Sequence, residues 1–205
     1  MAGIREIELK YALEGEGDYR RFCKGMGPPE DEWDQINHYF HSEDCVIPGS
    51  EGVIRIREEK GASVFAVKLG GLLSEALMSS REYGVPWPKD DESYRVSPGV
   101  LWNAGNQGMK ILEEKHGKRV PLVWAGQMIN HRRVFTWEKR LRIEVDASLF
   151  PDGFKDFEVE LETSFPERDR PRLISLLQSM DIGFRPQTKT KYHRFLEHGR
   201  GNRTT

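Results

Sequence analysis

Carboxylate side chains recur at alternate positions in several short stretches of the chain. Glu6 and Glu8 show the spacing first, and Glu144 and Asp146 repeat it. The carboxylates that share this pattern are Glu6, Glu8, Glu82, Glu144, Asp146, Glu158, Glu160 and Glu162. Clustered carboxylates without His or Cys are the ligands that hard divalent ions such as Mg²⁺ and Mn²⁺ prefer. The pattern therefore predicts an oxygen-lined metal site.

Basic side chains follow the same alternation in other stretches. They are Lys10, Arg55, Arg57, Lys68, Arg132, Arg142, Lys189 and Lys191. Ammonium and guanidinium groups suit phosphate oxygens. A triphosphate held by cations on one side and bridged by metal on the other is primed for attack by a metal-activated water. The two sets together predict triphosphate hydrolysis that needs no protein nucleophile.

The segments that carry these residues have the period of β-strands, because charged and bulky apolar residues alternate at every step. Such segments are 6–11, 53–57, 64–69, 141–146 and 157–162, with a weaker one at 189–192 and shorter strands at 37–41, 80–84 and 131–137. Each strand then has one charged and one apolar face. Since Arg81 and Glu82 are neighbours, at most one enters a shared interior, and we expect Glu82 there.

A closed antiparallel sheet would bring the charged faces together in its lumen and leave the apolar faces for helices. Each desolvated ion costs several kcal/mol unless it is paired or coordinated. A lumen of this kind is therefore reasonable only if it binds both a polyanion and a cation.

This series of residues resembles the CYTH domain, also called the triphosphate tunnel metalloenzymes. Glu6, Glu8 and Lys10 match the ExExK signature of that family. The agreement continues in chain order at 37–40, 55–57, 68, 81–82, 132, 142–146, 158–162 and 189–191. The resemblance spans residue 6 to about residue 195.

The resemblance implies an α+β fold, a closed eight-stranded antiparallel β-barrel with a charged lumen and helices packed outside. It also implies a division of the charged residues. The metal ligands would be Glu6, Glu8, Asp146, Glu158 and Glu160, and the phosphate ligands Lys10, Arg55, Arg57, Lys68, Arg132, Lys189 and Lys191. Glu82 and Glu144 would ligate metal or position water, and Arg142 would contact phosphate or neutralise Glu144 and Asp146. His41 and His131 depart from the family pattern and bear on which triphosphate is the substrate.

Other segments predict helices at 18–26, at 97–115 and from 166 to about 183. Residues 86–98 are typical of a surface loop. We expect one domain over residues 1–197 and a flexible tail over 198–205. The tryptophans, Trp33 among them, are expected to pack in the core.

Composition limits the function further. The net charge of -2 gives no attraction to long nucleic acid, and no apolar run reaches membrane-spanning length. Two cysteines without metal-ligand spacing favour a reducing compartment, so a cytoplasmic location is expected. We also expect a monomer or a homodimer. Two alternatives to the hydrolase stay open. One is a class IV adenylyl cyclase that makes cyclic AMP and pyrophosphate from ATP, and the other is a noncatalytic sensor of polyphosphate or nucleotide.

Overall fold

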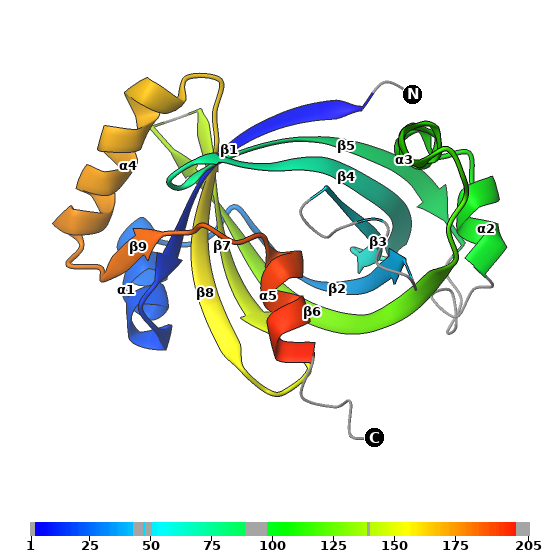
Figure 1. Ribbon diagram of the computed structural model, residues 1–205. Helices are drawn as coiled ribbons and strands as arrows, with labels where there is room; N and C mark the ends of the chain where they lie inside the picture. The colour runs from blue at the N-terminus through cyan, green and yellow to red at the C-terminus, as the bar shows by residue number, and fades with distance from the viewer. Residues whose placement is uncertain (1–2, 43–46, 48–50, 89–97, 139, 200–205) are drawn as a thin grey trace.

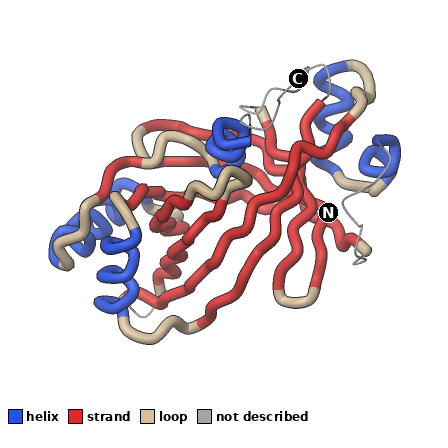
Figure 2. The backbone as a smooth tube through the Cα atoms, turned by 90° about the horizontal axis from the view of Figure 1, so that it is seen from below, coloured by secondary structure: helices blue, strands red, loops and turns tan. Residues whose placement is uncertain are grey.

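The computed structural model describes residues 3–42, 47, 51–88, 98–138 and 140–199, and it shows one antiparallel sheet that closes into a barrel (Figures 1 and 2). The strands are β1 (Ile4–Leu13), β2 (Asp31–Ser42), β3 (Gly52–Glu59), β4 (Ala62–Ser74), β5 (Leu77–Trp87), β6 (Leu122–Trp137), β7 (Leu141–Leu149), β8 (Lys155–Glu162) and β9 (Phe184–Pro186). The helices are α1 (Glu16–Met26), α2 (Pro98–Asn103), α3 (Gln107–His116), α4 (Pro166–Ser179) and α5 (Lys191–Gly199).

Strand β1 closes the barrel. The strand order is β5-β4-β3-β2-β6-β7-β8-β1, and β1 also pairs with β5. Residues 4–9 of β1 pair with β5, while residues 8–12 pair with β8. The short strand β9 pairs with residues 11–13 of β1, beyond the end of the pairing with β5. This ring of eight strands confirms the predicted closed antiparallel barrel.

The apolar outer faces of the strands carry the helices, as the alternation predicts. Leu9 and Val159 pack with Phe22 of α1 and Leu173 of α4 in one cluster. A second cluster covers the outer face of β3 and β4, where Ile56 and Phe65 meet side chains of α2 and α3. Within the described residues, no helix is long and apolar enough to span a membrane.

Helix α5 differs from the other helices, because it lies across one end of the barrel. Its residues Tyr192 and Phe195 pack with Tyr39 of β2 and Met128 of β6 in a third cluster. The prediction of a strand at 189–192 is therefore wrong. The apolar spacing of Tyr192, Phe195 and Leu196 is a helical signal that the shorter alternation concealed.

Several predicted boundaries also change. The stretch expected to be one helix from 97 to 115 is two helices, with Asn106 accepting a hydrogen bond from the Gly108 N–H as the cap of α3. Strand β6 begins at Leu122, not near His131. Residues 86 and 87 of the expected surface loop belong to β5, whereas 89–97 lie outside the described residues. Helix α5 includes the first two residues of the expected tail, and 200–205 lie outside the described residues.

Candidate active site inside the barrel

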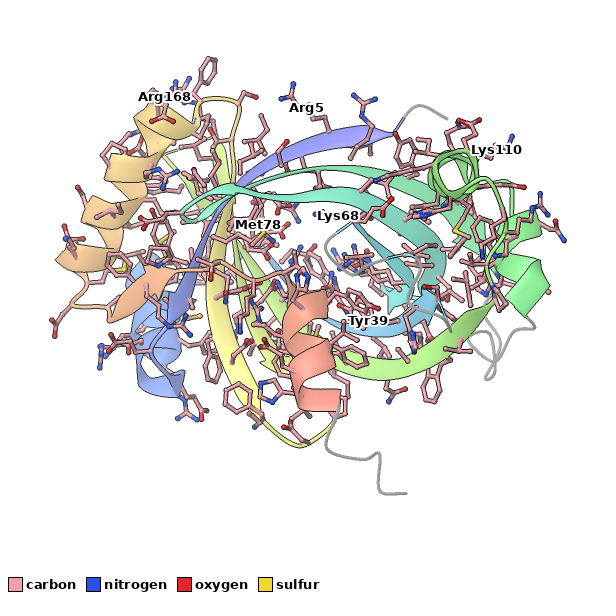
Figure 3. The ribbon with its side chains drawn as sticks, in the orientation of Figure 1. Arg5, Tyr39, Lys68, Met78, Lys110 and Arg168 are labelled. Atoms are coloured by element: carbon pink, nitrogen blue, oxygen red, sulfur yellow. The ribbon has the colours of Figure 1, made fainter. Side chains whose placement is uncertain are left out.

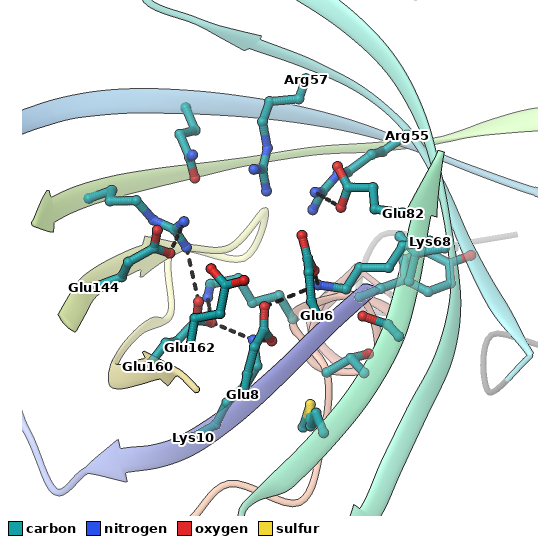
Figure 4. Close-up of a pocket in the computed structure, with 18 of the residues that line it drawn as sticks. Glu6, Glu8, Lys10, Arg55, Arg57, Lys68, Glu82, Glu144, Glu160 and Glu162 are labelled. Carbon is teal, nitrogen blue, oxygen red and sulfur yellow. Dashed lines mark hydrogen bonds and ion pairs between the residues drawn. The ribbon is translucent and has the colours of Figure 1, made fainter. Parts of the chain in front are cut away.

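A cavity of about 280 Å³ occupies the barrel, and ionic side chains dominate its wall (Figure 4). Among the described residues, seven carboxylates line it, namely Glu6, Glu8, Glu59, Glu82, Glu144, Glu160 and Glu162. Seven cations of the same ranges also line it, namely Lys10, Arg55, Arg57, Lys68, Arg132, Arg142 and Lys191. Figure 3 shows Lys68 and Tyr39 inside the ring of strands, whereas Arg5 and Arg168 point outward. The charged faces therefore meet in the interior.

Strand β1 supplies the first row of the site. Lys10 Nζ lies 2.8 Å from Glu8 and 2.6 Å from Glu160 on the neighbouring strand β8. Lys68 Nζ, from β4, lies 2.5 Å from Glu6 and 3.3 Å from Glu8. Each ammonium group thus bridges two carboxylates, so carboxylates and cations alternate along this wall.

Arg132 of β6 organises the adjoining part of the wall, which β6, β7 and β8 form. Its guanidinium group donates to both carboxylate oxygens of Asp146, at 2.8 and 2.6 Å, and to Glu160 at 3.1 Å. It also pairs with Glu144, which accepts a second ion pair from Arg142 at 2.7 Å. The register explains this arrangement, because Arg132 pairs with Asp146 in the β6–β7 ladder and Glu144 pairs with Glu160 in the β7–β8 ladder.

A group of three carboxylates extends from the cavity wall at Glu160 to Asp146 and Glu158 behind it. One oxygen atom from each of Asp146, Glu158 and Glu160 lies within 4.8 Å of the others, a spacing that suits a metal ion. Lys191 of α5 reaches this group, at 2.7 Å from Asp146 and Glu160, and also pairs with Glu158. Arg194 binds the other Glu158 oxygen at 2.7 Å. The chain's own cations therefore compensate these buried carboxylates.

The wall formed by β3 and β5 is richer in arginine. Arg55 pairs with Glu82 at 3.0 Å, and Glu82 lies inside as predicted, while Arg81 is exposed. Arg57 donates from Nε to the side-chain oxygen of Asn37 at 2.9 Å. This wall therefore presents two guanidinium groups, only one of which is paired with a carboxylate among the described residues.

Burial and neighbouring charges separate the cavity carboxylates by pKa. Burial alone would raise the pKa of Glu8, but Lys10 and Lys68 outweigh it and lower the pKa to about 2. Arg55 and Arg57 likewise outweigh burial at Glu82 and lower its pKa to about 2. Burial raises the pKa of Glu6, and the charge of Glu8 adds to the shift. Burial also raises the pKa of Glu144. The site therefore combines firmly ionised carboxylates with others that bind protons more readily.

Most of the residues expected at the site line the cavity, with three exceptions. Asp146 and Glu158 are buried behind the wall, exposed by only 0% and 1% respectively. Lys189 lies away from the cavity, in an exposed ion pair with Glu197 at 2.6 Å. The expectation that Lys189 lines the lumen with the other cations is wrong, because residues 189–192 are not a barrel strand.

Several lining residues were not expected from the sequence. Glu59 accepts hydrogen bonds from Trp33 at 2.9 Å and from Gln35 at 2.6 Å, and all three line the cavity. Trp33 is therefore not a purely internal packing residue. Glu59 follows Arg57 by two positions, so extending the alternation of β3 by one step would have found it.

The donor atoms of the cavity fit a hard divalent cation better than a soft one, because they are carboxylate oxygens. Glu6, Glu8 and Glu160 all line the cavity, and the ammonium group of a lysine bridges each neighbouring pair. Bridging cations show that these carboxylates lie close enough to share a positive charge. Asp146 and Glu158 are less accessible to an incoming ion, because they are buried and do not line the cavity. Glu160 pairs with Lys10, Arg132 and Lys191, but it reaches the cavity wall.

Comparison with known proteins identifies the family to which this barrel belongs. The CYTH domain profile matches residues 5–195, and the chain belongs to the CYTH family. No curated protein matches the chain at a significant level. The fold is similar to that of a Hippeastrum protein named as an adenylyl cyclase, for which a dominant triphosphatase activity is stated, with a TM-score of 0.81, 21% identity, and coverage of 94% of this chain and 95% of that one.

Two further solved structures share the fold. A protein from Bacillus halodurans, named as an adenylate cyclase, has a TM-score of 0.69 and 19% identity over 93% of this chain and 98% of its own. A Pyrococcus horikoshii protein has a TM-score of 0.56 and 17% identity over 94% of this chain and 98% of its own. At these identities the similarity shows a shared fold, and the predicted CYTH barrel is confirmed.

Proposed function

We propose that this chain is a metal-dependent triphosphatase, which hydrolyses inorganic tripolyphosphate or a small organic triphosphate inside the barrel. The observation that carries the proposal is the cavity itself, whose wall combines seven carboxylates and seven cations of the described residues. A protein gains nothing in stability from burying so many ions, because desolvation offsets their mutual attraction. Their concentration at one place supports binding of a ligand that carries both signs, such as a metal triphosphate.

The side chains of the site are arranged to exchange partners when such a ligand binds. Lys10 and Lys68 now bridge carboxylates of β1 and β8. Phosphate oxygens would take over these ammonium groups, while Glu6, Glu8 and Glu160 would hold the divalent ion. Arg55, Arg57 and Arg132 would orient the phosphate chain from other parts of the wall. A Mg²⁺ or Mn²⁺ ion bound there would supply Lewis-acid chemistry and an activated water.

The size of the cavity favours a compact substrate. Its volume of about 280 Å³ lies just below the roughly 300–1,000 Å³ of pockets that enclose drug-sized ligands. A chain of three phosphates needs no apolar pocket, whereas a nucleoside would. The cavity therefore favours inorganic tripolyphosphate, or an organic triphosphate whose organic group stays at the mouth. The triphosphatase activity stated for the Hippeastrum relative agrees with this direction.

A substrate panel tests the proposal. The protein should release phosphate from tripolyphosphate with Mg²⁺ or Mn²⁺, and a chelator should abolish the release. The same panel should contain thiamine triphosphate and nucleoside triphosphates, with cyclic AMP measured in the ATP reaction. Cyclic AMP and pyrophosphate from ATP would establish the cyclase instead. Tight binding of tripolyphosphate without turnover of any substrate would establish a sensor.

A further inference from the structure

Arg57 differs from every other cation of the cavity. The other six each form an ion pair with at least one carboxylate: Lys10, Arg55, Lys68, Arg132, Arg142 and Lys191. Among the described residues, no carboxylate forms an ion pair with Arg57, and its side-chain hydrogen bond runs from Nε to Asn37 Oδ1 at 2.9 Å. In Figure 4 its side chain extends from β3 into the cavity. Its positive charge is therefore oriented but not neutralised by a direct partner.

The surroundings make this charge costly in the free protein. Burial lowers the pKa of Arg57, and the positive charges of Arg55 and Arg132 lower it further. The more distant carboxylates of Glu82 and Glu59 act in the opposite direction without outweighing these effects. An anion placed against the guanidinium group would relieve both effects. Asn37 occupies only Nε, and the two terminal nitrogens have no hydrogen-bond partner among the described residues, so they can make a planar, two-point contact with phosphate oxygens.

Apart from the hydrogen bond that its side-chain oxygen accepts from Arg57, Asn37 is held in place by the surrounding fold. It faces Arg57 directly in the β2–β3 ladder, and its side chain is completely buried. Its Nδ2 atom is also buried and has no hydrogen-bond partner among the described residues. A buried donor without a partner weakens the folded state. An aspartate of nearly the same shape would remove that donor and would also bind Arg57 as a charged pair.

We propose that Asn37 is a positioning residue, which orients Arg57 through a neutral oxygen and so keeps its charge available for the substrate. This inference rests on the proposed function, because the anion it prepares for is the triphosphate. An aspartate at this position would satisfy the arginine from within the protein. The neutral amide of Asn37 fixes the orientation of the Arg57 side chain without neutralising its charge, so that charge can pair with the ligand.

The decisive variant is Asn37→Asp, assayed with tripolyphosphate and the metal ion that supports wild-type turnover. We expect KM to rise roughly tenfold or more, the value of one charge-assisted contact, while kcat changes little. The melting temperature should stay equal or rise, because a buried pair replaces an unsatisfied donor. A residue with a purely structural function would instead lose stability without a selective change in KM.

A double-mutant cycle with Arg57→Gln shows whether the effect passes through Arg57. In that background Asn37→Asp should no longer raise KM, because no guanidinium remains to be neutralised. Asn37→Ala is the second variant, and it should raise KM in the presence of Arg57 but not in its absence. It keeps the test informative if the aspartate variant does not fold.

Two results would overturn the proposal. One is a wild-type KM in both Asn37→Asp and Asn37→Ala, and the other is an undiminished effect of these variants without Arg57. Calorimetric titration with tripolyphosphate separates this proposal from the proposed function. If the wild type binds without turnover, the hydrolase assignment fails, and the same pattern in Kd still supports the positioning by Asn37. If the wild type binds no tripolyphosphate, both proposals fail.

Discussion

At the scale of single residues, Glu6 and Glu158 have the same side chain but different surroundings. Glu6 lines the cavity, and its described ion pair is with Lys68, a group that a phosphate can attract away. Glu158 is buried between Lys191 of α5 and Arg194 of the same helix. The first is therefore suited to bind an incoming ion, and the second to hold a helix against the barrel.

Replacement of Glu6 should affect catalysis. We expect Glu6→Gln to reduce metal-dependent phosphate release by roughly a hundredfold or more, because it removes an oxygen ligand without changing the shape of the side chain. The melting temperature should change little, since the residue is only half-buried at the cavity wall. Turnover equal to the wild type at saturating metal would exclude Glu6 as a ligand.

Replacement of Glu158 should affect stability. We expect Glu158→Gln to lower the free energy of unfolding by roughly 2 kcal/mol or more, because it removes the buried negative charge that pairs with both Lys191 and Arg194. Glu162→Gln on the same face of β8 is the control, and this exposed residue should cost no more than about 0.5 kcal/mol. Urea unfolding measures both. Equal effects of the two variants would contradict the structural function of Glu158.

At the scale of elements, alternation predicted the strands where it was regular and failed where the backbone interrupts it. The charged and apolar faces of β1, β3, β7 and β8 follow the sequence pattern closely. Strand β6 is longer than predicted. Its ladder with β2 shifts register between Tyr39 and Phe40, opposite the positive-φ residue Gly126, and this irregularity interrupts the alternation near the start of β6. No local signal could have revealed the partner strand that makes it continuous.

The cavity wall contains another glycine that the strand geometry requires. Gly70 of β4 has φ of 118°, and a Cβ atom there would lie 2.5 Å from the Ser79 carbonyl oxygen of β5. We expect Gly70→Ala to lower the free energy of unfolding by about 2 kcal/mol or more. Gly153→Ala is the control, because Gly153 also has a positive φ, of 87°, but a Cβ atom there would have no neighbour within 4 Å. It should cost only about 1 kcal/mol in the same denaturant titration. Equal losses would show that the β4–β5 contact relaxes freely.

The pairing of β2 with β3 also gives the fold a pH dependence. Burial lowers the pKa of His38 below its ordinary value of 6.5, although Glu58 at 2.9 Å acts in the opposite direction. The folded chain therefore binds the proton less readily than the unfolded chain. The contribution of neutral His38 to the free energy of unfolding is fully present above pH 6.5. It is lost as pH falls toward the pKa of His38 in the folded chain, by up to about 1.4 kcal/mol per pH unit. His38→Gln should remove this part of the slope in urea unfolding between pH 7 and pH 5. An unchanged slope would contradict the assignment.

At the scale of the whole molecule, the division of charge between two sets of residues was predictable, but the depth of each residue was not. The alternation places Asp146 and Glu158 on the same inner faces as Glu144 and Glu160. Only the position of α5 shows that Lys191 and Arg194 cover the deeper pair. The prediction that Lys189 lines the lumen failed for the same reason, because the alternation of the strands does not indicate that a helix lies across the end of the barrel. The residues that can contact a substrate in the cavity are therefore fewer than the charged residues on the inner faces of the strands.

The central claim is that this cavity hydrolyses a triphosphate with the help of a divalent ion. The most direct measurement is phosphate release from tripolyphosphate by the wild type and by Glu6→Gln, with Mg²⁺ or Mn²⁺ and then with a chelator added. The account predicts turnover by the wild type, its loss with the chelator, and a large reduction in the variant. Silence of the wild type across tripolyphosphate, thiamine triphosphate and nucleoside triphosphates, or turnover that Glu6→Gln leaves intact, would contradict it.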